Sequence, residues 1–170
     1  GGTLGVTVDL AAGTAIDGFG DTDTLTNIER VQGTDSDDTL IGNSSNNRFR
    51  GRSGNDLIDG GDGTGDEVDY LTSPGAATVD LAAGTALDGF GTTDTLVNIE
   101  NIRGSGSDDV LTGDANDNLF RGLGGNDVID GGDGFDTADY SQEEIFGGAS
   151  VSGVTVDVSN GSGTAIDGFG

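Results

Sequence analysis

The chain contains no cysteine, histidine, methionine or tryptophan, and only one proline among its 170 residues. Without cysteine no disulfide can stabilise the fold, and without histidine the usual zinc sites and histidine acid–base catalysis are excluded. Lysine is also absent, so all six basic residues are arginine, and they face 31 acidic residues at a net charge of −25. This charge argues against nucleic-acid binding, which needs a basic surface, and it favours either disorder or bound cations.

Long apolar runs are missing as well, so no membrane insertion is expected. What the chain does have is glycine, at 34 positions, which is too many for an ordinary core. The glycines do not follow the three-residue period of collagen, so that fold is excluded.

A long internal repeat organises the chain. The segment "TVDLAAGTAIDGFGDTDTLTNIE" from Thr7 returns from Thr78 with few changes, an offset of 71 residues, and a third copy opens at Thr155. We therefore expect one continuous solenoid made of a first copy at 1–70 (spacer strands 1–32, nonapeptides 33–70), a second copy at 71–153 (spacer strands 71–103, nonapeptides 104–140, insertion 141–153) and the start of a third copy at 154–170.

A nine-residue repeat lies inside each copy. From Gly33 it reads "GTDSDDTLI", "GNSSNNRFR" and "GRSGNDLID", with Asp or Asn at position six and an apolar residue at position eight. The apolar position predicts a strand of about three residues, and the glycine-rich residues before it predict a turn. Two units make one coil of about 18 residues, and stacked coils bury one apolar column. We expect that column to contain Leu40, Phe49, Ile58 and Val68, followed by Leu111, Phe120, Ile129 and Ala138.

These nonapeptides resemble the RTX, or hemolysin-type calcium-binding, repeat family. The resemblance implies an all-β, right-handed parallel β-roll, a β-solenoid without substantial helix, with several Ca²⁺ ions held between neighbouring turns. For this length we expect roughly nine coils of about 18 residues each.

The repeat register predicts which turns face each other, because stacked turns on one side of a roll are about 18 residues apart. The candidate pairs of metal ligands are Asp38 with Asp56, Asp109 with Asp127, Asn47 with Asp66, and Asn118 with Asp136. Threading the spacers in the same way adds a pair of Asp23 with Asp38 and a pair of Asp94 with Asp109. Candidate backbone carbonyl ligands are those of Gly33, Gly42, Gly51, Gly60, Gly104, Gly113, Gly122 and Gly131.

Competing interpretations are weaker. "DTDTLTNIE" begins like an EF-hand loop, but it lacks the required glycine, and Leu25 fills a ligand position. The recurring carboxylates have no cleft partner, so we expect no enzyme activity. We expect the arginines to form salt bridges or to lie solvated at strand edges, rather than to bind a carbohydrate or an anion. We expect Phe19, Phe90 and Phe169 to fill gaps at the edge of the roll.

The resemblance suggests a secreted calcium-binding module that folds on binding Ca²⁺ and acts as a rigid spacer in a bacterial adhesin, surface-layer protein or extracellular filament. The alternative is the non-catalytic repeat region of a secreted enzyme, such as a serralysin-like protease or an alginate epimerase, where it would aid type I secretion and folding. The expected partners are calcium ions and neighbouring copies of the module, joined end to end.

Overall fold

Short strands, most of them three residues long and centred on an apolar or small residue, build the fold. The computed structural model describes residues 4–141, 155–157 and 164–166, which form eighteen strands and no helix. The described residues accordingly contain no helix that is long and apolar enough to cross a membrane.

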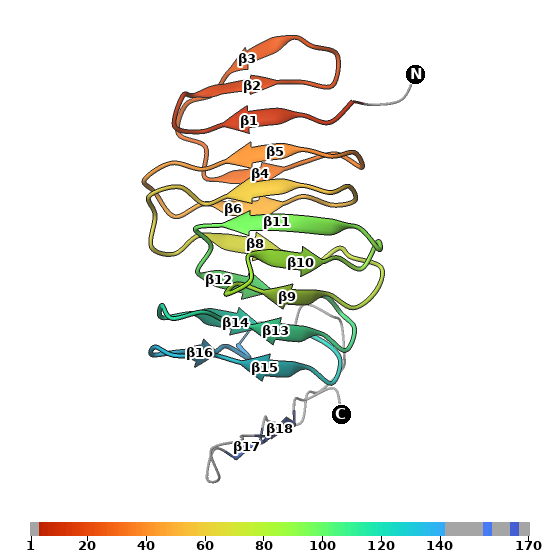
Figure 1. Cartoon of the computed structure of the whole chain (residues 1–170), viewed down its shortest axis with the longest axis vertical. Helices are drawn as coiled ribbons and strands as arrows, with labels where there is room; N and C mark the ends of the chain where they lie inside the picture. The colour runs from red at the N-terminus through yellow and green to blue at the C-terminus, as the bar shows by residue number, and fades with distance from the viewer. Residues whose placement is uncertain (1–3, 142–154, 158–163, 167–170) are drawn as a thin grey trace.

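Two sheets face each other along the stack, with the strands lying across its long axis (Figure 1). In spatial order, the first sheet consists of β15 (Val128–Asp130), β13 (Val110–Thr112), β9 (Thr78–Asp80), β10 (Thr85–Leu87), β11 (Thr93–Val97), β7 (Leu57–Asp59), β5 (Thr39–Ile41), β1 (Thr7–Asp9), β2 (Thr14–Ile16) and β3 (Thr22–Thr24). The second sheet consists of β16 (Thr137–Ala138), β14 (Leu119–Arg121), β12 (Asn101–Arg103), β8 (Glu67–Asp69), β6 (Arg48–Arg50) and β4 (Arg30–Gln32). A separate hairpin, β17 (Thr155–Asp157) with β18 (Thr164–Ile166), pairs in the same antiparallel register as β1 with β2.

The nonapeptide strands pair in parallel, as the repeat predicts. Leu40 lies beside Ile58 in the first sheet, and Phe49 lies beside Val68 in the second, so neighbouring coils are one coil length apart in sequence. The expected all-β parallel β-roll is therefore confirmed.

The predicted apolar column lies between the sheets. Leu40, Phe49, Ile58, Val68 and Leu111 are fully buried, and Phe120 is nearly so. Ile129 is only partly buried and Ala138 is exposed, because β15 and β16 are the last described strands of their sheets and nothing described covers them.

The spacers differ from the expected eighteen-residue coils. In each of the first two copies the spacer forms a three-stranded antiparallel meander, β1–β2–β3 or β9–β10–β11, within the first sheet. Local turns reverse the chain before it can cross to the other sheet. Asp9 Oδ1 accepts from Ala12 N, and Asp17 Oδ1 accepts from Phe19 N and Asp21 N, so two short turns replace one long crossing.

These tight turns also overturn the expectation that their phenylalanines fill gaps. Phe19 is 90% exposed and Phe90 is 40% exposed. Both residues lie in turns in which the aspartate two residues earlier accepts a hydrogen bond from the phenylalanine amide. Phe169 lies outside the described residues.

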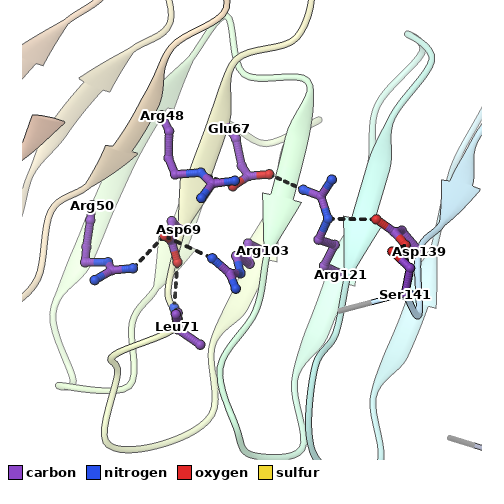
Figure 2. Close-up of polar contacts among 9 residues, drawn as sticks. All are labelled: Arg48, Arg50, Glu67, Asp69, Leu71, Arg103, Arg121, Asp139 and Ser141. Carbon is purple, nitrogen blue, oxygen red and sulfur yellow. Dashed lines mark hydrogen bonds and ion pairs between the residues drawn. The ribbon is translucent and has the colours of Figure 1, made fainter. Parts of the chain in front are cut away.

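The outer face of the second sheet carries a ladder of ion pairs (Figure 2). Glu67 pairs with Arg48 at 2.5 Å and also with Arg121, which in turn reaches Asp139 at 2.9 Å. In the neighbouring row Asp69 pairs with Arg50 at 2.6 Å and lies 3.8 Å from Arg103. Of the two expected roles for the arginines, the structure shows salt bridges for these residues. Since Glu67 and Asp69 belong to the first copy, and Arg103 and Arg121 to the second, the ladder also connects the two copies.

Candidate metal centre

A column of stacked acidic turns follows one edge of the roll. Each carboxylate at position six accepts a hydrogen bond from the backbone amide of the turn before it. Asp56 Oδ1 accepts from Asp38 N at 2.8 Å, and Asp127 Oδ1 accepts from Asp109 N at 2.9 Å. Asp38, Asp56 and Asp109 are at most 3% exposed. The predicted stacking of these two pairs is what the structure shows.

The opposite edge carries a similar column. Asp66 Oδ1 accepts from Asn47 N at 2.6 Å, and Asp136 Oδ1 accepts from Asn118 N at 3.0 Å. The asparagine oxygens turn back into their own loops, where Asn47 Oδ1 accepts from Asn43 N. The predicted neighbours therefore lie together on this edge as well.

The two pairs predicted from the spacers are wrong. Asp94 lies next to Asp56, not Asp109, because β11 pairs with β7 and the strands β10 and β9 separate it from β13. Asp23 lies on β3, separated from the Asp38 turn by β2 and β1, and it is exposed. The antiparallel meander causes both errors, because it inserts two strands where the threading assumed a direct stack.

Glycine keeps space open beside the turn oxygens. A Cβ atom added to Gly42 would lie 2.0 Å from Gly60 O, and one added to Gly33 would lie 2.2 Å from Asp38 Oδ2. Corresponding distances of 2.0 to 2.3 Å to an oxygen are found at Gly33, Gly42, Gly51, Gly60, Gly104, Gly113, Gly122 and Gly131. No side chain heavier than hydrogen fits there, so the first glycine of every nonapeptide borders a small cradle lined by oxygen.

Several carboxylates in these cradles lack a counter-charge. Asp56 Oδ2 and Asp66 Oδ2 are buried and have no hydrogen-bond partner among the described residues. Burial raises the pKa of Asp56 to about 7, opposed by the hydrogen bond to its other oxygen from Asp38 N. Burial likewise raises the pKa of Asp94 to about 6 and raises the pKa of Asp109. Since a buried carboxylate is costly without a positive partner, these turns favour a bound cation.

The available ligands suit calcium. In the described part of the chain no three acidic side chains gather at one point, so a site can use at most two carboxylates and must complete its shell with other oxygens, such as backbone carbonyls. Ca²⁺ takes six to eight oxygen ligands of both kinds, and its coordination geometry is flexible. An all-oxygen set of this kind does not suit zinc, which prefers thiolate and imidazole. The residues present therefore fit Ca²⁺.

Sequence reasoning missed two participants in these columns. Glu100 Oε2 accepts from Asp66 N at 2.9 Å, so its carboxylate continues the second column across the boundary between copies. Tyr70 donates its hydroxyl to Asp94 Oδ2 at 2.9 Å, so this buried carboxylate has a neutral partner. For Glu100 the available sequence signal is the recurrence of "NIE" at 27–29 and 98–100.

The comparisons agree with the geometry. The family model of the RTX calcium-binding nonapeptide repeat (4 copies) matches residues 32–66 and 103–138, which are the two blocks of stacked turns. A search of curated proteins finds no match to the chain. The nonapeptide register, the parallel roll and the oxygen-lined turns all coincide with the matched segments, and these two segments are RTX, or hemolysin-type, calcium-binding repeats.

Proposed function

We propose that this calcium-binding β-roll folds on binding Ca²⁺ outside the cell and serves there as a rigid, non-catalytic spacer in a bacterial adhesin, surface-layer protein or extracellular filament. The observation that carries the proposal is the pair of carboxylate columns, in which acidic side chains are buried one above another without positive partners.

Charge explains why calcium would control folding. At a net charge of −25 the metal-free chain repels itself, and stacking the turns would bury carboxylates whose ionised form is disfavoured there. A ligand that binds only the folded state stabilises it in proportion to the logarithm of its concentration over its dissociation constant. Low cytosolic Ca²⁺ would leave the chain open for export, and millimolar extracellular Ca²⁺ would fold it.

The continuity of the sheets supports a spacer role. Strands β8 and β12 are hydrogen-bonded neighbours, as are β7 and β11, so the first and second copies share both sheets. No linker separates them, and the cross-copy pair of Glu67 with Arg121 adds a charged contact. A repeat that joins its neighbour in this way transmits force and orientation along the stack.

Circular dichroism tests the proposal. In EGTA at neutral pH the chain should be largely unfolded, and Ca²⁺ should restore the strand signal, whereas Mg²⁺, which keeps its waters, should not. Asp56→Asn should raise the Ca²⁺ concentration needed for folding. Asp133→Asn, the same change at an exposed turn residue outside position six, should not. A chain that is fully folded in EGTA would refute the proposal.

A further inference from the structure

The turn Asn98–Glu100 occupies the place of a nonapeptide turn. The amide of Gly42 donates to Asp59 O, and in the next coil the amide of Gly60 donates to Val97 O. Asp59 immediately precedes Gly60, and Val97 immediately precedes Asn98, so Asn98 stands where the first glycine of a nonapeptide would stand.

The end of this turn matches in the same way. Glu67 N donates to Asn47 O at 2.9 Å, and Asn101 N donates to Asp66 O at 2.8 Å. Glu100, just before Asn101, therefore stands where Asp66 stands in its own turn. Three residues, Asn98 to Glu100, span what residues 60–66 span in the coil before.

The oxygens of this short turn also match. A Cβ on Gly42 would lie 2.0 Å from Gly60 O, and a Cβ on Gly60 would lie 2.0 Å from Asn98 O. Asn98 has a φ of 51°, in the left-handed region, which asparagine tolerates better than most residues. Its side chain is anchored by a 2.8 Å hydrogen bond from Nδ2 to Asp59 Oδ1, which holds the carbonyl under Gly60.

Glu100 supplies the carboxylate that the shorter turn needs. Its Oε2 accepts from Asp66 N at 2.9 Å, just as Asp66 Oδ1 accepts from Asn47 N. The extra methylene of glutamate compensates for a turn that is shorter than the nonapeptide turn above it. In the turn stacked on Glu100, Asp66 Oδ2 is buried beside Gly63 and has no hydrogen-bond partner among the described residues. Asp66 Cγ also lies 2.9 Å from the space beside Gly60 that Asn98 O borders.

We propose that the turn at residues 60–66 and the turn Asn98–Glu100 together bind a Ca²⁺ ion at the junction between the two repeat copies. Asp66 and Glu100 would supply carboxylates, and Asn98 would supply a backbone carbonyl. The family match ends at residue 66 and resumes at 103, so it does not cover Asn98 or Glu100. The inference rests on the proposed calcium function and extends it to the spacer, which would then contribute a ligand of its own.

The first copy provides a matched control. Glu29 follows Asn27 in the same "NIE" sequence, and Asn27 has the same left-handed backbone, with φ of 54°. Strand β4, which directly follows Glu29, is the end strand of the described part of the second sheet, so no turn stacks on Glu29 as residues 60–66 stack on Glu100, and its side chain is exposed. Glu29→Gln therefore removes the same charge from the same motif without removing half of a stacked pair.

Calorimetric titration of the whole chain with Ca²⁺ tests the proposal, with folding followed by circular dichroism. Glu100→Gln should bind one ion fewer than the unmodified chain, and Glu29→Gln should bind the same number. Unchanged stoichiometry and affinity in Glu100→Gln, or an equal loss in both variants, would overturn the inference. A chain that binds no Ca²⁺ at all would instead refute the proposed function.

A second variant covers the case in which Glu100→Gln does not fold. Glu100→Asp keeps the charge but shortens the side chain by one methylene, so its carboxylate should no longer reach Asp66 N. It should also bind one ion fewer while it remains folded at high Ca²⁺. Full stoichiometry in Glu100→Asp would show that reach is unimportant and would contradict the proposed geometry.

Discussion

Neutralising Glu67 should weaken the connection between the two repeat copies. Its side chain is 7% exposed, and its carboxylate pairs with Arg48 of the first copy and Arg121 of the second. Glu67→Gln keeps the shape of the side chain but removes its charge, which leaves Arg48 without its ion pair, while Arg121 keeps Asp139.

The expected loss follows from the burial of the partners. Removing one member of a fully buried ion pair costs about 3–5 kcal/mol. Arg48 and Arg121 stay 25% and 13% exposed, so water can partly replace the lost carboxylate. We therefore expect the free energy of unfolding to fall by about 2 kcal/mol.

Urea unfolding at saturating Ca²⁺ measures this loss, with Asp35→Asn as the control. Asp35 pairs with Arg52 at 3.0 Å, but the two side chains are 62% and 40% exposed, so that variant should lose less than about 1 kcal/mol. Because Glu67 links the copies, its variant should also broaden the transition or split it in two. Equal losses in the two variants, or no loss in Glu67→Gln, would refute the view that the ladder holds the copies together.

Three further predictions concern the cradles, the buried carboxylates and the shape of longer arrays. Gly42→Ala places a Cβ 2.0 Å from Gly60 O and should lower the stability measured by thermal unfolding with Ca²⁺ by about 1–3 kcal/mol. Gly124→Ala, whose added Cβ would have its nearest neighbour 3.7 Å away, should leave stability nearly unchanged. Similar losses in the two variants would contradict the oxygen-lined cradle. Since burial raises the folded-state pKa of Asp56 to about 7, above its usual 3.8, the folded chain binds more protons than the unfolded chain between these values. Strand signal in EGTA should therefore fall as the pH rises from about 4 to about 7, and a rise over this window would be inconsistent with it. Each of the first two copies adds five strands to the first sheet and three to the second, or about 24 Å against about 14 Å. Long arrays should therefore curve, and their longest dimension in small-angle scattering should grow less with each added copy; strictly linear growth would argue against curvature.

The sequence predicted the roll and its main pairs because the nonapeptide carries its own geometry. An apolar residue at position eight defines the inward side of each strand, and glycine with Asp or Asn defines each turn. Since a solenoid coil contacts only its neighbours, the period alone places Asp38 beside Asp56 and Asn118 beside Asp136. The same reasoning placed Leu40 and Phe49 in the core.

The spacers could not be predicted in this way, because their course depends on a choice between two kinds of turn. A chain that leaves β1 can cross to the second sheet or reverse within the first, and both paths satisfy the same alternating pattern. Hydrogen bonds inside the turns at Asp9 and Asp17 favour reversal. That choice moved Asp94 next to Asp56, and it brought Glu100 beneath Asp66.

By itself, then, the sequence determined what every nonapeptide does, since local period and turn chemistry are written into each nine-residue unit. Only the tertiary structure decided where one copy meets the next. Glu29 and Glu100 both follow Asn-Ile in the sequence, yet Glu29 is exposed and Glu100 is partly buried against Asp66. The difference comes from the coil stacked above Glu100, a contact between residues 34 positions apart that no local pattern specifies.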